Sequence, residues 1–148
     1  MNPSLYIMCG LPCSGKSTFA KSILGFKVLS SDDYIEQRAK ELQKTYNEVF
    51  DETIQRANQA FFQDVFKEAK LKNNIIIDRT NLNKSTRLKF IKIFQQHEPI
   101  IFYFDTPIEV IKKRNNRLGK FISEEIFNSM LKSLHPPTED ECPVVTFN

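Results

Sequence analysis

Short runs of apolar residues recur along this chain, and between them apolar residues return every three or four positions. Runs of this kind predict buried strands, and the wider spacing predicts helices that pack one face against a sheet. The expected strands are 5–9, 26–30, 75–78, 99–104 and 143–147. Because helical stretches separate all of them, these strands are expected to form a parallel sheet covered on both faces.

The helices expected between these runs are 17–24, 34 to about 72 with a break near 45–47, 84–96, 107 to about 118, and 123–134. Leu88, Ile91 and Phe94 are spaced as the buried side of the helix over 84–96. Three phenylalanines widen the apolar stripe of the long helix, either as core or as a wall beside a substrate: Phe50, Phe62 and Phe66.

The segment from Gly10 to Thr18 reads Gly-Leu-Pro-Cys-Ser-Gly-Lys-Ser-Thr and fits the phosphate-binding pattern G-x-x-x-x-G-K-[ST]. It lies between an expected strand and an expected helix, which is the context the motif needs. Its glycines let the backbone turn its N–H groups toward phosphate oxygens, and the helix start adds positive charge. Lys16 supplies a cation for the β- and γ-phosphates, and Ser17 a hydroxyl for Mg²⁺. The expected nucleotide contacts are Gly10, Pro12, Cys13, Ser14, Gly15, Lys16, Ser17 and Thr18.

The motif and the alternation of strands with helices together predict an α/β fold of the P-loop NTPase type. We expect a three-layer sandwich with about five parallel strands, helices on both faces and a helical lid over about 112–124. At 148 residues, the chain has the length of one domain, 1–148. Right-handed crossovers bring all the loops that follow strands to one edge of such a sheet.

Carboxylates follow two of the expected strands. Asp32 and Asp33 come after the second strand, at the sheet edge where ligands bind in α/β folds. Capping of the next helix accounts for one of the two. Asp78 ends the run Ile75–Ile77 and resembles a Walker-B acid, which holds Mg²⁺ through water.

Basic residues form two blocks without any acid, although the net charge is only +3. The first extends over 79–97 and the second over 110–123, with five lysines and arginines in each. They point to a polyanionic ligand on one side, or to solvated helix faces. Arg114 and Arg117 are three residues apart and precede Gly119, which is typical of a lid that closes on phosphates; surface ion pairs are the alternative.

Composition narrows the class of protein. Hydrophobic residues make up 41% and charged residues 26%, as in ordinary globular chains, and no apolar run approaches the ~20 residues that a membrane span needs. The first residues lack the basic region of a signal peptide. Three cysteines, one of them in the phosphate loop, argue against a disulfide framework. We therefore expect a cytoplasmic protein with no membrane association and no obligate protein partner.

In its order of motifs, the chain resembles the 5′-hydroxyl polynucleotide kinases of the phage type, over almost its whole length. Besides the phosphate loop, the matching segments are Ser31-Asp32-Asp33-Tyr34, Thr80-Asn81-Leu82-Asn83 with Arg87, Phe104-Asp105-x-Pro107 with Glu109, Lys113-Arg114-Asn115 with Gly119, and Ser129-Met130-x-Lys132-Ser133. The resemblance implies a P-loop kinase domain without the phosphatase domain that some members carry. It also implies a role in nucleic acid repair.

The resemblance implies a role for individual residues. Lys16 and Ser17 would hold the phosphates of ATP, or of another nucleoside triphosphate, and Mg²⁺. The second expected metal contact, Asp78, comes from its Walker-B-like place at the end of a strand and not from the resemblance. Asp32 would be the general base for the 5′-hydroxyl of a DNA or RNA end, and Arg114 and Arg117 would clamp the phosphates. Thr80, Asn81 and Arg87 would lie in the region that supports the acceptor pocket. The candidate substrate-binding residues as a whole are Asp33, Arg79, Thr80, Asn81 and Arg87.

The sequence departs from the phage pattern beside the Asp-Asp-Tyr motif. Ser31 and Ile35 stand where the phage member has arginines, and Arg79 stands where it has an aspartate. Arg79 or Arg38 is a candidate for the missing cation. Two other functions stay open: a kinase for a small-molecule hydroxyl, such as a nucleoside, sugar or antibiotic, and a nucleotide-binding switch with little chemistry of its own.

Overall fold

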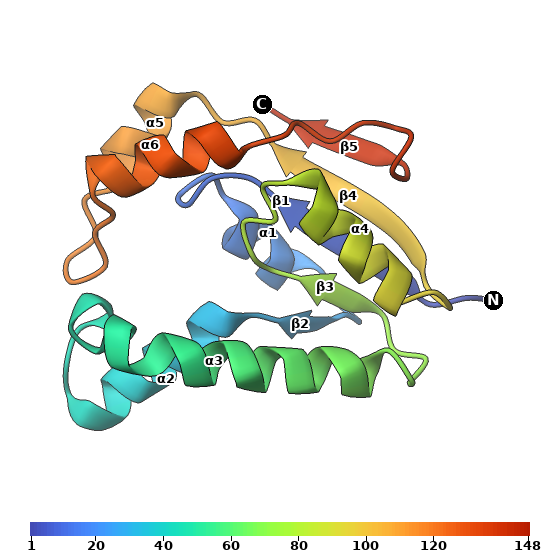
Figure 1. The fold of residues 1–148 in the computed structure, drawn as a ribbon, viewed down its shortest axis with the longest axis horizontal. Helices are drawn as coiled ribbons and strands as arrows, with labels where there is room; N and C mark the ends of the chain where they lie inside the picture. Colours follow the sequence, from blue (N-terminus) through green and yellow to red (C-terminus); the bar gives the residue numbers. More distant parts are fainter.

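Five parallel strands form one sheet in the computed structural model, which describes residues 1–148. They are β1 (Ser4–Cys9), β2 (Lys27–Leu29), β3 (Ile75–Ile77), β4 (Glu98–Phe104) and β5 (Val144–Phe147). Their order across the sheet is β2-β3-β1-β4-β5, so β1, which leads into the phosphate loop, lies at the centre (Figure 1). The expected parallel sheet is confirmed, and the ends of each strand lie within one residue of its predicted range.

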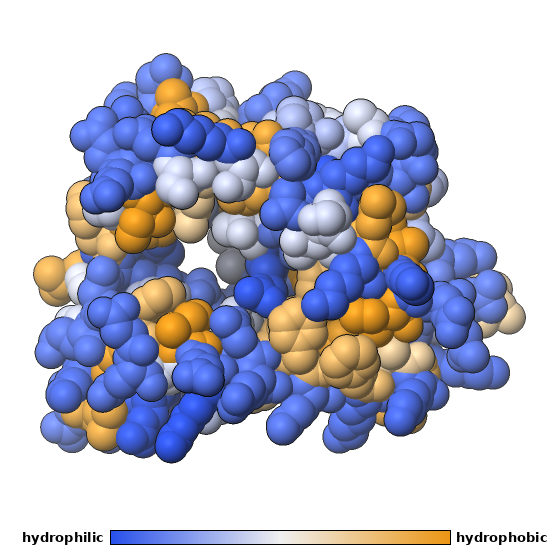
Figure 2. Space-filling view, in the orientation of Figure 1, coloured by the Kyte–Doolittle hydropathy of each residue, from blue (hydrophilic) through white to orange (hydrophobic).

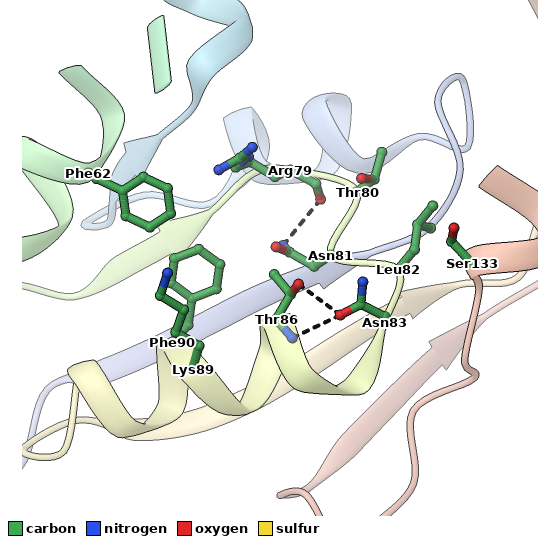
Figure 3. Close-up of a pocket in the computed structure, with 10 residues that line it drawn as sticks. All are labelled: Phe62, Arg79, Thr80, Asn81, Leu82, Asn83, Thr86, Lys89, Phe90 and Ser133. Carbon is green, nitrogen blue, oxygen red and sulfur yellow. Dashed lines mark hydrogen bonds between the residues drawn. The ribbon is translucent and has the colours of Figure 1, made fainter. Parts of the chain in front are cut away.

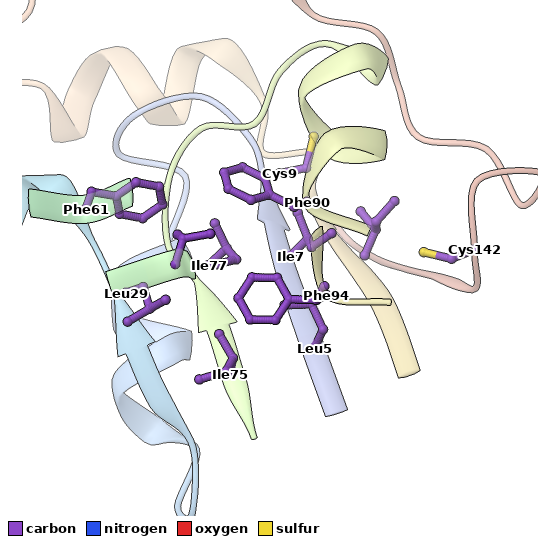
Figure 4. Packing of buried hydrophobic residues seen from close by; sticks show 12 residues of the cluster. Leu5, Ile7, Cys9, Leu29, Phe61, Ile75, Ile77, Phe90, Phe94 and Cys142 are labelled. Atoms are coloured by element: carbon purple, nitrogen blue, oxygen red, sulfur yellow. The ribbon is translucent and has the colours of Figure 1, made fainter. Parts of the chain in front are cut away.

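Helices cover both faces of this sheet. On one face, α3 (Tyr46–Glu68) and α4 (Lys84–Ile93) pack Phe61, Phe90 and Phe94 against the strands, and the resulting cluster of 12 buried residues is the main core (Figure 4). On the other face, α1 (Lys16–Ser22) packs Ala20 against Met8 and partners from β3 and β4. The three-layer architecture is therefore confirmed.

Helix α2 (Ser31–Leu42) pairs with α3 beside the β2 edge of the sheet. The expected single helical region is divided at 43–45, slightly earlier than predicted, because Gln43 adopts a left-handed φ of 55°. The Thr45 side chain accepts a hydrogen bond from the Glu48 amide, and the Glu48 side chain bonds back to Thr45. This capping box starts α3 afresh.

Helices α5 (Ile108–Arg114) and α6 (Glu124–Ser133) lie beyond the carboxyl ends of the strands (Figure 1). The prediction that Arg114 and Arg117 share a helix face is wrong, because α5 ends at Arg114. Asn115 donates to the Ile122 carbonyl at 2.7 Å and accepts from the Ile122 amide at 3.0 Å. These two bonds close residues 115–122 into a loop where another helical turn was expected.

The buried side of α4 is also different from the one predicted. Leu88 is 40% exposed, whereas Arg87 and Phe90 are 0% and 1% exposed. Ile91 and Phe94 do lie against the core as expected. The difference arises because Arg87 has buried partners far away in the sequence, which rotate the helix. None of the helices is both long enough and apolar enough to cross a bilayer.

Candidate active site

The phosphate loop has a backbone that only certain residues can adopt. Gly15 has a φ of 107°, a conformation that side-chain-bearing residues rarely reach, and it begins α1. At Gly10, a Cβ atom would lie 2.9 Å from Ser14 Oγ and 3.0 Å from the Phe104 carbonyl oxygen. Position 10 therefore requires glycine because of close packing, and position 15 requires it because of its dihedral angle.

Lys16 lies folded inside this loop. Its Nζ donates to the Leu11 carbonyl at 2.7 Å and to Ser14 Oγ at 3.4 Å, and the residue is only 7% exposed. Burial lowers the pKa of Lys16 to about 8, against the opposing effect of nearby Asp78. The ammonium group is thus held by neutral oxygens and lacks a direct carboxylate partner, which leaves it free to pair with an anion.

Neighbouring loops fix the phosphate loop in place. Thr106, just after β4, donates to the Ser14 carbonyl at 2.9 Å, and the Gly10 amide donates to the Thr80 carbonyl at 3.0 Å. From α5, Arg114 donates through Nη1 to the Cys13 carbonyl at 3.1 Å. The structure therefore places Arg114 beside the phosphate loop. Pro12 and Thr18 lie on the loop and on the first turn of α1.

Ser17 and Asp78 meet at the mouth of the loop. Ser17 Oγ donates to Asp78 Oδ2 at 2.9 Å, across 61 residues of sequence. Burial raises the pKa of Asp78, while the hydrogen bond from Ser17 and the charge of Lys16 oppose this shift. The pair offers hard oxygen ligands of the kind that Mg²⁺ prefers, and Mg²⁺ commonly completes its shell with water and substrate phosphates. No cluster of three or more His, Cys, Asp or Glu side chains gathers elsewhere for a metal ion.

Asp32 is held from two sides at the start of α2. The Tyr46 hydroxyl donates to Asp32 Oδ1 at 2.6 Å, and Lys120 Nζ lies 3.5 Å from Asp32 Oδ2. Burial and this hydrogen bond raise the pKa of Tyr46 well above its ordinary range, so the phenol remains a donor. The Asp33 carboxylate makes no hydrogen bond or ion pair, and burial raises its pKa against the effect of Lys21.

The loop 115–122 is fastened to the start of α3. The Asn47 amide donates to the Gly119 carbonyl at 2.8 Å, and the Asn47 side chain bonds the Phe121 backbone twice, at 2.9 Å each. Lys120 adds an ion pair of 2.5 Å to Glu36. Gly119 has a φ of 73°, and a Cβ there would meet Thr45 at 2.5 Å. Figure 2 shows the molecule hollowed between this loop and the sheet edge.

Arg117 lies on this same loop, and its exposed side chain makes no hydrogen bond or ion pair. Its charge acts on Tyr46, whose pKa it lowers slightly against the larger effect of burial. Arg114 therefore lies at the phosphate loop, whereas Arg117 lies near enough to Tyr46 for its charge to act on that residue.

Arg87 is fully buried and has no free N–H group directed to a ligand. It pairs with Glu141 through Nε at 2.8 Å and Nη2 at 3.1 Å, and both side chains are 0% exposed. Its remaining donors go to the carbonyls of Asn81, Leu82 and His135, and to Cys9 Sγ. Arg87 therefore has no N–H group left for a direct contact with an acceptor, and it positions the loop 79–83 from below.

Glu141 is the residue of this region that sequence reasoning missed. Burial would raise its pKa, but hydrogen bonds from Arg87 and from the Thr138 amide hold the pKa below its ordinary value. Glu141 is 54 residues from Arg87 and belongs to no motif. The signal that could have found it was an arginine on the buried side of α4, which requires an acid or several carbonyls as partners.

The loop 79–83 also borders a cavity of about 340 Å³ on the α4 side (Figure 3). Asn81 is buried with a φ of 45° and donates to the Met8 carbonyl at 2.6 Å, so its side chain supports the loop. Thr80 and Arg79 line the cavity, and Arg79 lies with its Cζ 4.7 Å from the centre of the Phe61 ring. Of the expected acceptor residues, Arg79 and Thr80 are thus the ones open to a ligand on this side.

Comparison with known proteins agrees with this geometry. The model of the AAA_33 family, described as an AAA domain, matches residues 5–137. The chain is 26% identical over 138 residues to an L-seryl-tRNA(Sec) kinase of Methanococcus maripaludis, a match that covers 90% of this chain and 53% of that protein.

Solved structures give the same fold. A chain of the Pnkp1/Rnl/Hen1 RNA repair complex superposes with a TM-score of 0.68 at 25% identity, over 90% of this chain and 44% of that one. A gluconokinase from Sinorhizobium meliloti 1021 superposes with a TM-score of 0.62 at 16% identity, over 97% and 81% of the two chains. The chain spans about half the length of the first two relatives, and its fold is that of the P-loop kinases.

Proposed function

Because the chain belongs to the AAA_33 family of AAA domains, we propose that it is an ATP-dependent kinase that phosphorylates the 5′-hydroxyl of a polynucleotide, DNA or RNA. The observation that carries the proposal is the placement of Asp32. A carboxylate oriented by Tyr46 lies near enough to Lys16 for its charge to act on that residue, and Arg114 bonds the loop that holds Lys16. This is the arrangement of a proton acceptor opposite a triphosphate cradle.

In the proposed reaction, the oxygen of the acceptor hydroxyl bonds to the γ-phosphorus of ATP, and Asp32 accepts the proton that this hydroxyl loses. The bond from that phosphorus to the β-γ bridging oxygen breaks, and ADP leaves. Lys16 and Arg114 stabilise the charge that develops on the phosphate oxygens. A bound Mg²⁺ would be held by Ser17 and Asp78 and would neutralise charge on the β- and γ-phosphates.

We assign residues 112–124 as the lid of the single kinase domain. The hydrogen bonds of Asn47 with Gly119 and Phe121 hold this loop over the hollow. Release of these few exposed bonds would open a path for the substrate. In the closed arrangement, Arg117 would complete the phosphate clamp from the side opposite Arg114.

Two relatives favour a nucleic acid as the acceptor. One is named as a tRNA kinase and the other belongs to an RNA repair complex. The rival acceptor is a small-molecule alcohol, and one observation favours it. Ser31 and Ile35 occupy the positions where the resemblance places arginines, and neither side chain carries a cation for a phosphate. Both are also buried, at 8% and 0% exposed.

Transfer of labelled γ-phosphate from ATP to a 5′-hydroxyl oligonucleotide tests the proposal. We expect a labelled oligonucleotide, no label on the same oligonucleotide with a 5′-phosphate, and loss of transfer in Lys16→Ala. Label only on nucleosides or sugars would support the small-molecule kinase. Tight ADP binding with no transfer and no hydrolysis would support a nucleotide-binding switch.

Nucleotide affinity should fall as the pH rises above 8. The protonated form of Lys16 pairs with phosphate, and its pKa of about 8 in the free protein must rise when the anion binds. Above pH 8, ADP binding therefore requires proton uptake and weakens by up to about tenfold per pH unit. Calorimetry in two buffers of different ionisation enthalpy measures this uptake. An ADP affinity that does not change between pH 7 and 9 would contradict the assignment.

A further inference from the structure

The cavity beside the loop 79–83 lies on the side of that loop away from the phosphate loop. It is enclosed by α3, by the loop itself, by α4 and by the end of α6, where Ser133 contributes (Figure 3). Its volume of about 340 Å³ is at the small end of the range for ligand sites. A cavity of this size fits one nucleotide unit and excludes a duplex.

The charge of the cavity is entirely positive. Arg79 and Lys89 line it, and no acidic side chain does. Neither of these two cations forms an ion pair, and the Arg79 guanidinium makes one hydrogen bond, to Asn58 Oδ1 at 3.4 Å. Burial lowers the pKa of Arg79, and the charge of Asp32 opposes this shift. A half-buried guanidinium without a counter-ion is suited to an anion.

An aromatic wall faces the same two cations. The centre of the Phe62 ring lies 4.8 Å from Lys89 Nζ and 5.8 Å from Arg79 Cζ. The Phe62 and Phe90 rings are nearly parallel, at 9° and 6.1 Å between centres. The surface around them is also apolar: Phe66 is 53% exposed, and Figure 2 shows apolar side chains gathered over the seam between α3 and α4. Cations beside aromatic faces are the elements that bind single-stranded nucleic acid.

The loop 79–83 connects this cavity to the proposed active site. Asp78, just before it, bonds Ser17, and the Thr80 carbonyl accepts the Gly10 amide at 3.0 Å. The loop is fixed from below by Arg87 and by Asn81. A strand whose 5′ end reaches Asp32 can therefore continue across Arg79 into the cavity.

We propose that this cavity binds the nucleotide that follows the acceptor residue of a single strand. Its phosphodiester lies between Arg79 and Lys89, and its base packs on the Phe62 ring as Lys89 turns to the phosphate. The inference rests on the proposed function, because it takes the acceptor to be a polynucleotide. It names the part of the protein that would discriminate a polynucleotide from a single nucleoside.

Binding of a fluorescent 5′-hydroxyl oligonucleotide, followed by anisotropy in the presence of ADP, tests the cavity without catalysis. The double substitution Arg79→Gln/Lys89→Gln should weaken binding by about 10- to 100-fold. It should also lower the salt slope by about 0.7, because the two cations together neutralise one phosphate, and each neutralised phosphate of a single strand adds about 0.7 to that slope. Phe62→Leu should weaken binding about tenfold, since the base would have no ring on which to stack. Lys92→Gln, which removes an exposed charge from the same helix outside the cavity, should change little.

The outcomes separate this inference from the proposed function. Equal losses in Lys92→Gln and in the double variant, or no loss in either, would overturn the cavity site even where the wild type transfers phosphate to oligonucleotides. Loss in the double variant alone, with transfer only to small alcohols, would support the cavity site while the proposed function fails. Retained ADP affinity in each variant shows that it is folded, and a wild type that binds no oligonucleotide overturns both.

Discussion

Asp32→Asn is expected to lower phosphoryl transfer by about 10²- to 10⁴-fold, the usual contribution of a general base, while ADP affinity stays near that of the wild type. The amide keeps the size of the carboxylate, and its oxygen still accepts the hydrogen bond from Tyr46. It cannot accept a proton from the acceptor hydroxyl. The change therefore removes the proposed chemistry and preserves the local geometry.

Single-turnover transfer to a saturating acceptor measures this effect apart from binding. Glu36→Gln is the matched control, because Glu36 also pairs with Lys120, at 2.5 Å, but has no assigned role in proton transfer. Its rate should stay within a few-fold of wild type. Wild-type rates in Asp32→Asn would show that another group accepts the proton. Equal losses in both variants would show that the position of Lys120, which both acids hold, affects the transfer rate more than the proposed base does.

The phosphate loop and the sheet could be predicted because their signals are local. Gly15 and Lys16 belong to a pattern of eight consecutive residues, and each buried strand is a run of consecutive apolar residues. Parallel strands then place Ser17 and Asp78 at one edge, where the structure joins them by a 2.9 Å hydrogen bond. Local pattern and chain topology were sufficient for this half of the site.

The lid and the underside of α4 could not be predicted because they depend on distant partners. Helical spacing alone puts Arg114 and Arg117 on one face, but the side chain of Asn115 bonds Ile122 and ends the helix between them. Likewise Leu88 has the spacing of a core residue, yet the burial of Arg87 against Glu141 turns it toward solvent. In both cases a polar side chain with a buried or backbone partner overrides the apolar pattern.

The ion pair between Arg87 and Glu141 should be decisive for stability. Arg87→Met leaves the Glu141 carboxylate buried without its partner, and breaking such a pair by removing one member costs roughly 3–5 kcal/mol. The same change frees the carbonyls of Asn81 and Leu82 at the base of the loop 79–83. We therefore expect a fall of roughly 10 °C in the unfolding midpoint and a loss of oligonucleotide binding that exceeds the loss of ADP binding.

The double variant Arg87→Met/Glu141→Leu separates the charge from the packing. Removing both charges should restore much of the lost stability, because no carboxylate is then buried alone. Lys84→Met, which breaks the exposed pair with Asp140 on the same helix, should leave the midpoint near that of the wild type. An Arg87→Met midpoint equal to that of Lys84→Met would contradict the role given to the buried pair.

The pH dependence of the same series gives an independent check of sign. Folding lowers the pKa of Glu141, so its contribution to stability is fully present above the ordinary value of 4.5 and is lost as the pH falls through the lower value of the folded protein. The wild type should therefore lose its advantage over the double variant as the pH falls below 4.5, and keep it at neutral pH. Urea unfolding at several pH values measures this difference, and an advantage that persists unchanged into acid would mean that the carboxylate is not the ionised partner of Arg87.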